Sequence, residues 1–215
     1  MKLKSLLFSA FMLSAFIMVA QDWSTDVYKY GTLYPGYVID ADGNKTEGFI
    51  KYRNRVSLQT NILFYTDKND KKSKVKYKSQ DLTEYKVADK VYHVIHYSGG
   101  LLSKPVRGNL LVVDGCIKQY VWYNKADDIS TLRKTSSETQ AEFEERQYPS
   151  TTLFVKDGDE KPQTIAKMGL GFAKDMPEWI GDQPELAEKV ANKEKGYKAL
   201  SMYAVIEEYN ENCEN

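Results

Sequence analysis

The sequence has few of the residues that common catalytic sites require. Its 215 residues include two cysteines and two histidines. It lacks a Gly-x-Ser-x-Gly nucleophile elbow, a His-Glu-x-x-His zinc motif, a phosphate-binding Gly-x-x-x-x-Gly-Lys-Ser/Thr loop and a Cys-x-x-Cys pair. We therefore expect no catalytic residue of these classes, no metal site and no cofactor.

The chain also has no net charge, since its 30 Lys and Arg residues balance 30 Asp and Glu residues. A neutral chain without a dense Lys/Arg block predicts no nucleic-acid partner, because phosphate binding needs a concentrated basic face. The hydrophobic fraction of 42% and the aromatic fraction of 13% are typical of a folded globular protein rather than a disordered one.

Only one long apolar run occurs, from Leu6 to Ala20, and it follows the basic residues Lys2 and Lys4. This pattern predicts a signal peptide over residues 1–20, with cleavage after Ala20. A membrane anchor is the alternative, but the run is shorter than the roughly 20 residues that span a bilayer. We expect a mature chain of residues 21–215 that is periplasmic or secreted and not an integral membrane protein.

Residues 27–165 are typical of β-strands, with short runs rich in Tyr, Val, Ile and Phe between Gly, Asn and Asp. Residues 36–40 and 46–53 predict a hairpin whose turn contains Asp42-Gly43. In residues 73–78, Val75 and Tyr77 alternate with lysines, which predicts one buried face. The polar stretch 124–150 predicts a long loop. Further strands are expected at 61–66, 83–87, 91–97, 109–114, 117–123, 151–156 and 161–165.

From residue 169 to residue 211 the period changes to that of helices. Phe172, Met176, Trp179 and Ile180 form an amphipathic stripe, and Pro177 predicts a break within it. Asp182 is the expected N-cap of the next helix. A last helix over 197–209 would bury a face that includes Leu200, Tyr203, Ala204 and Ile206. The whole predicts an α+β fold in one domain: a mainly antiparallel β-sheet or partial barrel, followed by C-terminal helices packed on it.

Three segments carry a resemblance: the hairpin from Gly36 to Asn54, Tyr77-Lys-Ser-Gln-Asp-Leu82, and Glu208-Tyr-Asn-Glu-Asn-Cys213. Together they resemble a group of uncharacterised exported proteins of Bacteroidetes-type bacteria, which have a similar opening hairpin and a similar Tyr-Asn-x-Cys-like helix end. The resemblance spans most of the mature chain. It implies export and this architecture, and it implies no activity.

One strand carries a candidate binding row. Alternation along residues 116–123 places Cys116, Lys118, Tyr120 and Trp122 on one face. Aromatic rings beside a lysine suit a peptide or glycan ligand, because the rings offer flat apolar area with a polar handle. The alternative is that these aromatics pack under the C-terminal helices.

The remaining polar candidates have structural explanations. His93 and His96 fall on opposite faces of a strand, so a shared metal would need a bulge. The acidic turns Asp40-Ala-Asp-Gly43 and Asp67-Lys-Asn-Asp70 lack a full calcium ligand set and predict hairpin turns. The acids of the polar stretch are expected to be solvated rather than to form a glycosidase acid/base pair; they are Asp127, Asp128, Glu142, Glu144 and Glu145.

Two functions follow from these observations. The first is an exported, non-catalytic binding or cell-envelope-associated protein, whose partner is an envelope protein, a peptide or a glycan. The alternative is a carboxylate-dependent hydrolase that acts on envelope or dietary polysaccharide. Two acids converging in an aromatic cleft, roughly 5 to 9.5 Å apart, would favour the hydrolase.

The two cysteines leave two possibilities open. Cys116 begins a predicted strand and Cys213 ends the last helix, so a disulfide between them would tie the helices to the sheet, and export favours it. The resemblance implies a different arrangement, because related chains often have a cysteine where this chain has Gln183. Cys213 would then have lost a local partner, and both thiols would be free.

Overall fold

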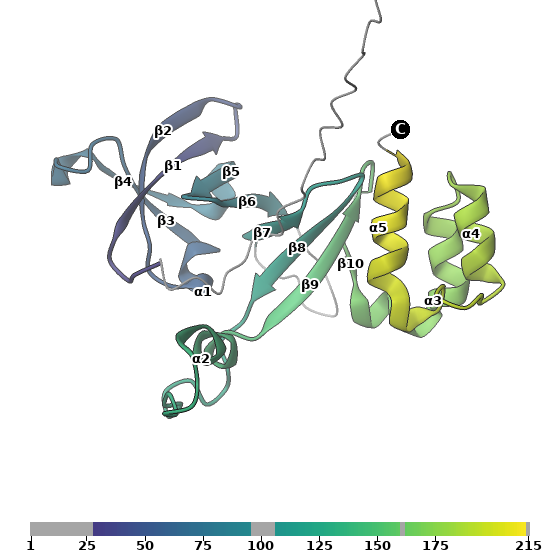
Figure 1. The fold of residues 1–215 in the computed structure, drawn as a ribbon. Coiled ribbons are helices and arrows are strands. Elements are labelled where there is room, and N and C mark those ends of the chain that lie inside the picture. The colour runs from purple at the N-terminus through teal and green to yellow at the C-terminus, as the bar shows by residue number, and fades with distance from the viewer. Residues whose placement is uncertain (1–27, 96–105, 160–161, 214–215) are drawn as a thin grey trace, which may run out of the picture.

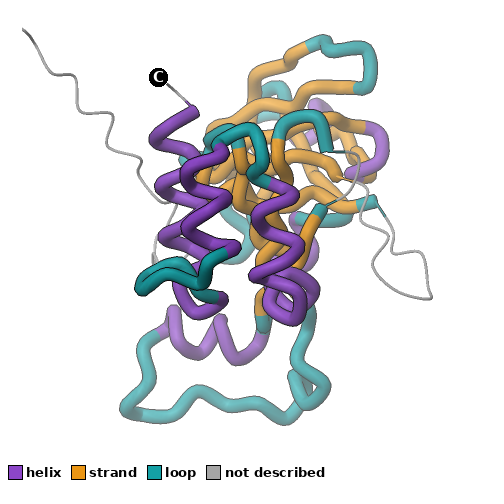
Figure 2. The backbone as a smooth tube through the Cα atoms, turned by 90° about the vertical axis from the view of Figure 1, so that its right-hand side faces the viewer, coloured by secondary structure: helices purple, strands orange, loops and turns teal. Residues whose placement is uncertain are grey.

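The computed structural model describes residues 28–95, 106–159 and 162–213, so the predicted signal peptide and His96 lie outside the described residues. The fold has a curled β-sheet and a layer of C-terminal helices beside one end of it (Figure 1). Figure 2, turned by 90°, shows these helices in front of the strands.

The described residues form one antiparallel sheet of ten strands in the order β10-β9-β8-β7-β6-β5-β1-β2-β3-β4. The sheet curls without closing, since β10 and β4 are its two ends. The predicted α+β fold is confirmed, with an open sheet. The strands are β1 Leu33–Asp40, β2 Lys45–Lys51, β3 Asn61–Tyr65, β4 Lys74–Lys78, β5 Leu82–Val87, β6 Lys90–Ile95, β7 Arg107–Val113, β8 Ile117–Tyr123, β9 Ser150–Lys156 and β10 Gln163–Thr164.

The predicted first hairpin is present as β1 and β2. The Asp40 carboxylate accepts the backbone N–H groups of Asp42 (3.0 Å) and Asn44 (2.9 Å), which closes the turn. Gly43 has φ of +84°, a conformation that glycine adopts without strain. Asp40 is therefore a turn residue, in agreement with its interpretation from the sequence.

Strand β4 differs from its prediction, because the side chain of Val75 is 40% exposed. The cause is its position: β4 is the last strand of the sheet and pairs only with β3. An end strand of a curled sheet has little to cover its inner face. Tyr77 is half-buried and lies edge-on to Phe64, with ring centroids 6.2 Å apart.

The helices are α1 Arg55–Leu58, α2 Gln140–Gln147, α3 Ile165–Trp179, α4 Pro184–Ala191 and α5 Met202–Cys213. Helix α2 lies where the sequence predicted a loop, so that prediction was wrong. A capping box begins it: the Thr139 hydroxyl accepts the Glu142 N–H, and the Glu142 carboxylate accepts the Thr139 N–H. Helix α2 buries no residue, which is why no apolar periodicity revealed it.

Two details of the helical region correct the sequence interpretation. Helix α3 is interrupted at Gly171, whose φ and ψ are −114° and 15°, and not at Pro177, which lies in the last turn. The residue that caps α4 is Gln183 rather than Asp182. Asp182 instead accepts hydrogen bonds from Lys156 (2.6 Å) and from the Tyr209 hydroxyl (2.6 Å).

Helix α5 buries Ile206, as expected, but not the other residues of the predicted face. Leu200 is fully exposed in a short 3-10 turn before α5, and Tyr203 and Ala204 are exposed. The sequence pattern contained two overlapping apolar faces, and the packing selects the second. The buried residues are Met202, Val205, Ile206, Tyr209 and Asn210.

Two hydrophobic cores result. The aromatic core lies inside the curl of the sheet and contains Tyr52, Phe64, Tyr85, Tyr92 and Tyr123 among its buried residues. The helical core lies between α3, α4, α5 and the sheet. It contains Ile117, Phe154, Met168, Phe172, Met176, Ile180, Leu186, Val190, Met202, Val205, Ile206 and Tyr209.

Strand β8 belongs to both cores and is clamped at both ends by a carboxamide. The Gln59 side chain donates to the Tyr123 carbonyl (2.8 Å) and accepts its N–H (2.6 Å). At the other end the Asn210 side chain accepts the Ile117 N–H (2.7 Å) and donates to its carbonyl (3.0 Å). Gly115 allows this approach, because a Cβ there would lie 2.7 Å from the Asn210 amide.

A disulfide joins Cys116 to Cys213, with 6.6 Å between the Cα atoms. Of the two possibilities left open by the sequence, the structure thus contains the bridge. Gln183 also lies beside the end of α5, where its side chain donates to the Tyr209 carbonyl (2.8 Å). The amide therefore links α4 to α5 at the position where related chains were expected to have a cysteine.

None of the helices within the described ranges combines the length and the apolar character needed to cross a membrane.

Candidate functional site

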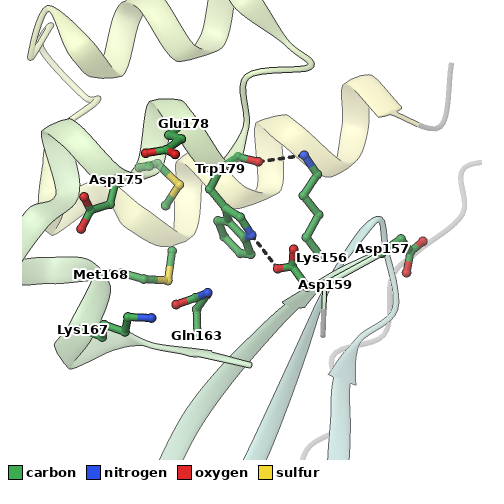
Figure 3. A pocket seen from close by; sticks show the side chains of 11 residues that line it. Lys156, Asp157, Asp159, Gln163, Lys167, Met168, Asp175, Glu178 and Trp179 are labelled. Carbon is green, nitrogen blue, oxygen red and sulfur yellow. Dashed lines mark hydrogen bonds between the residues drawn. The ribbon is translucent and has the colours of Figure 1, made fainter. Parts of the chain in front are cut away.

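A cleft of about 650 Å³ lies between helix α3 and the turn that follows β9 (Figure 3). We call it the α3 cleft. In Figure 3, Asp175 and Glu178 lie on one side of Met168, and Lys167 and Gln163 lie on the other. The residues that line it are Lys156, Asp157, Gly158, Asp159, Gln163, Lys167, Met168, Asp175, Met176, Glu178 and Trp179.

Local sequence builds the two walls. The β9 wall ends in a tight turn in which Gly158 has φ of +90° and the Asp159 N–H bonds to the Lys156 carbonyl (2.9 Å). The α3 wall begins at Thr164, whose hydroxyl accepts the Lys167 N–H (3.3 Å). This cap fixes the start of the helix directly after the short strand β10.

The floor of the cleft is apolar and adaptable. Met168 and Met176 are buried on the same side of α3, with 6% and 1% of their surface exposed. Methionine side chains are flexible and polarisable, so they fit apolar groups of different shape. The interruption of α3 at Gly171 lies between the two methionines.

Trp179 joins the two walls. Its indole Nε1–H donates to a carboxylate oxygen of Asp159 (2.7 Å), while the ring stays half-buried. The Asp159 carboxylate is therefore already held by one donor of the protein. This hydrogen bond fixes the turn against α3 and sets the width of the cleft at that end.

The Lys156 ammonium is committed to the protein and lies beyond Trp179 from Met168 (Figure 3). It donates to the Trp179 carbonyl (2.8 Å) and to Asp182 (2.6 Å). Partial burial raises the pKa of Asp182, but the hydrogen bonds from Lys156 and Tyr209 outweigh it and hold this pKa below its ordinary value. Lys156 thus positions the walls and offers no free charge to a ligand.

The acids of α3 are differently placed. Asp175 and Glu178 are exposed, and neither forms an ion pair with any residue that the structure describes. Lys167 is the cation on the opposite side. The cleft therefore combines an apolar floor with two uncommitted carboxylates, an arrangement that attracts a cationic group with an apolar stem.

The binding row predicted from the sequence is not an open surface. Tyr120 and Trp122 are only 3% and 4% exposed, and they pack with Leu111 and Leu153. Lys118 pairs with Asp157 (2.7 Å). Both rings are thus buried, yet they lie on the sheet face opposite Ile117 rather than under the helices, so the expected location of the packing was also wrong.

His93 belongs to a hydrogen-bonded chain on the same face as Tyr120. Its Nδ1 lies 2.9 Å from the Tyr120 hydroxyl and its Nε2 lies 3.4 Å from Glu84, which also accepts from the Tyr37 hydroxyl. Burial lowers the pKa of His93 below 6.5 against the opposing effect of Glu84 and Asp114. Burial and the Glu84 bond raise the pKa of Tyr37 to about 12.

Such a chain would need an activated group and space for a substrate to do chemistry. His93 is held between two partners, and the Tyr37 phenol is less acidic than usual. We therefore interpret the chain as a structural link between β1, β5, β6 and β8.

The remaining acidic candidates have local partners. Asp70 accepts the Lys72 N–H (2.8 Å) in a turn, Glu142 caps α2, and Glu144 lies 3.3 Å from the buried Arg55 guanidinium. In the described parts of the chain, no group of three or more His, Cys, Asp or Glu side chains is placed to hold a metal ion. Asp127 and Asp128 have no such local partner among the described residues and are exposed in a turn, in agreement with their interpretation as solvated acids.

The sequence analysis missed the α3 cleft, although it named Met176 and Trp179 as part of a helix stripe. The sequence contains no signal for the second wall, because the packing of the β9 turn against α3 follows from tertiary structure. Comparisons of the chain with protein-family models, curated proteins and solved structures gave no match. Function is therefore argued from the geometry of the cleft.

Proposed function

We propose that this protein is an exported, non-catalytic binding protein of the cell envelope, and that its α3 cleft binds a basic, amphipathic peptide segment. One observation carries the proposal: the uncommitted carboxylates of Asp175 and Glu178 stand beside an apolar floor of Met168 and Met176. The export component rests on the predicted signal peptide. The disulfide is compatible with an oxidising compartment.

The chemistry of the lining favours a lysine or arginine side chain as the inserted group. The stem of such a side chain is apolar and its head is cationic, so the stem would lie over the methionines while the head reaches the acids. A glycan is less well matched, because it would stack on Trp179, whose indole is already bound to Asp159 of the opposite wall.

The hydrolase alternative makes a different demand on the same acids. A general acid is kept protonated by burial in apolar surroundings, as in glycosidases. Asp175 and Glu178 are exposed, and Asp159 is bound to the Trp179 indole. These positions favour ligand binding over acid catalysis.

Calorimetric titration with an acetylated, amidated Lys-Leu-Lys-Leu-Lys peptide tests the proposal. The variant Asp175→Asn/Glu178→Gln should weaken binding about tenfold, because exposed ion pairs contribute about 0.2–1 kcal/mol each. The matched control is Glu145→Gln/Glu207→Gln, which removes the same charge from two exposed positions outside the cleft. Equal binding by both variants would show that the peptide does not use the cleft.

Export is tested separately. Protein from fractionated native cells should have an intact mass that corresponds to a chain beginning near Gln21. It should be found in the periplasm or the medium. A cytoplasmic product that retains residues 1–20 would contradict the export component and leave the cleft assay unaffected.

A further inference from the structure

Lysines gather in the hairpin formed by β3 and β4. Between Lys68 and Lys78 the chain has six lysines and one aspartate, and all six lysine side chains are exposed. The sequence analysis found no dense Lys/Arg block, and this segment shows that the interpretation was wrong. We call it the lysine hairpin; its basic residues are Lys68, Lys71, Lys72, Lys74, Lys76 and Lys78.

The nearby acids serve the backbone instead of the lysines. Asp67 accepts the Asn69 N–H (2.8 Å), and Asp70 accepts the Lys72 N–H (2.8 Å). Asp81 likewise accepts the Lys78 N–H (2.9 Å). Over the described residues, no lysine of the hairpin lies within 4.0 Å of a carboxylate oxygen. The six ammonium groups are therefore presented to solvent.

The position of the hairpin makes these charges accessible. Strand β4 ends the sheet, and its connection to β3 projects from the molecule on the side away from α4 (Figure 1). Lys74, Lys76 and Lys78 alternate along β4, so their side chains share one face, about 7 Å apart. An extended surface can approach this edge without meeting the helices.

The helical end has the opposite charge. From Ile165 to Cys213 the helical layer contains nine acids and six lysines. The basic hairpin and the acidic excess of the helical layer thus lie at opposite ends of the molecule (Figure 1). In the field of an anionic surface this separation of charge orients the protein with the hairpin inward.

We propose that the lysine hairpin docks the protein on an anionic lipid surface, with the hairpin against the phosphate headgroups and the α3 cleft facing away. Lysine is a mobile point charge that suits headgroups without a fixed geometry, and the hairpin from residue 61 to residue 78 contains no arginine. Each lysine near such a surface strengthens binding about fivefold.

Two other occupants fit less well. Single-stranded nucleic acid is bound by aromatic stacking, but the hairpin tyrosines Tyr65 and Tyr77 are half-buried. A second copy of the chain paired through β4 would place lysines opposite lysines, which is destabilising. The docking surface gives the envelope association proposed above a physical basis. It does not involve the cleft, so either proposal can fail alone.

Co-sedimentation with vesicles tests the docking surface. The purified protein should bind vesicles of equal parts phosphatidylcholine and phosphatidylglycerol, and binding should weaken when salt is raised towards 1 M, where the screening length is about 3 Å. Phosphatidylcholine vesicles should not bind it, which controls for apolar attachment through residues 6–20.

The variant Lys71→Glu/Lys74→Glu/Lys76→Glu should lose at least about a hundredfold in vesicle affinity. Replacement of the same three lysines by Gln should lose about a hundredfold, and the Glu variant should lose more than the Gln variant, which separates lost attraction from added repulsion. The matched control is Lys174→Glu/Lys195→Glu/Lys198→Glu, which changes the net charge equally at exposed positions of the helical end. Thermal unfolding midpoints confirm that all variants are folded.

Three outcomes would overturn the proposal. One is unchanged vesicle binding by the hairpin variants, and another is an equal loss in the helical control. The third is tighter binding to a single-stranded DNA oligonucleotide than to phosphatidylglycerol at the same salt, which would assign the hairpin to nucleic acid.

Discussion

The aromatic core and the helical core are held together by different means. The aromatic core lies among hydrogen-bonded strands and contains rigid rings, such as the stacked pair Tyr85 and Tyr92 with centroids 4.8 Å apart. The helical core contains the flexible side chains Met168, Met176 and Met202. The helices α3–α5 follow β10, the last strand that the structure describes, and are not held to the sheet by strand-to-strand hydrogen bonds. A disulfide and the Asn210 clamp fix α5 to β8 instead. Packing of flexible side chains specifies the position of a helix weakly. In this protein the disulfide and the Asn210 clamp therefore fix the position of α5 on β8.

Of the changes that test the difference between the two cores, removal of the helices should have the largest effect on folding. A chain that ends at Lys167 loses the partners of Ile117 and Phe154, so the sheet exposes apolar surface. We expect aggregation on size-exclusion chromatography and no cooperative thermal transition. A soluble fragment that melts cooperatively would show instead that the aromatic core folds without the helical core.

Removing the disulfide should have the next largest effect. The double variant Cys116→Ser/Cys213→Ser should lose about 4 to 5 kcal/mol of unfolding free energy, because the bridge closes a loop with a sequence separation of 97. Denaturant unfolding with and without reductant measures the loss. In limited proteolysis, cleavage should appear within α3–α5 before it appears in β1–β8. Unchanged stability on reduction of the parent protein would contradict this.

The two carboxamide clamps provide a matched pair of substitutions. Gln59→Ala and Asn210→Ala each leave a buried N–H and carbonyl of β8 without their partner, which costs about 2 to 4 kcal/mol. The loss should be smaller for Asn210→Ala, because the disulfide still holds α5 near β8. Denaturant midpoints decide the order. A larger loss at Asn210 would mean that the clamp, and not the bridge, positions α5.

The smallest predicted effect concerns pH. Burial lowers the folded-state pKa of His93 below 6.5, so the unfolded chain binds the proton more readily. The stability contribution of His93 is therefore full above pH 6.5 and is lost as the pH falls through the folded pKa. Glu84, Asp114 and Lys118 act on the same ring. Compared with the parent, His93→Gln should make the unfolding free energy depend less steeply on pH below about pH 6.5. If the slope of unfolding free energy against pH is the same in the variant and the parent, the pH dependence arises from groups other than His93.

The sequence predicted the strands better than the helical layer, for a physical reason. Alternation over a few residues identifies a strand with one buried face, and the Asp42-Gly43 turn fixes a hairpin locally. Exceptions arise at edges, as with the exposed side chain of Val75. A helix with several apolar residues has more than one possible buried face. Leu200 and Tyr203 were therefore assigned to the core, while the sheet selects Val205 and Tyr209.

The α3 cleft was harder to predict, because it depends on more than one segment of the chain. The Thr139–Glu142 capping box is a local signal for α2 that the sequence does contain. The α3 cleft has no such signal, since the Asp159 and Trp179 contact joins a turn to a helix end. The lysine hairpin lies within one stretch of the sequence, and the interpretation that the chain has no dense Lys/Arg block was wrong there.

The position of the disulfide also determines when it can form during synthesis of the chain. The chain emerges from its N-terminus, so β1–β8 and Gln59 are available well before Cys213, which follows Cys116 at a sequence separation of 97. Cys116 therefore remains a free thiol until α5 has folded against β8. If the helical layer folds slowly, this thiol can form a disulfide with a neighbouring chain. Synthesis under oxidising conditions without the final turn of α5 should therefore yield disulfide-linked dimers through Cys116.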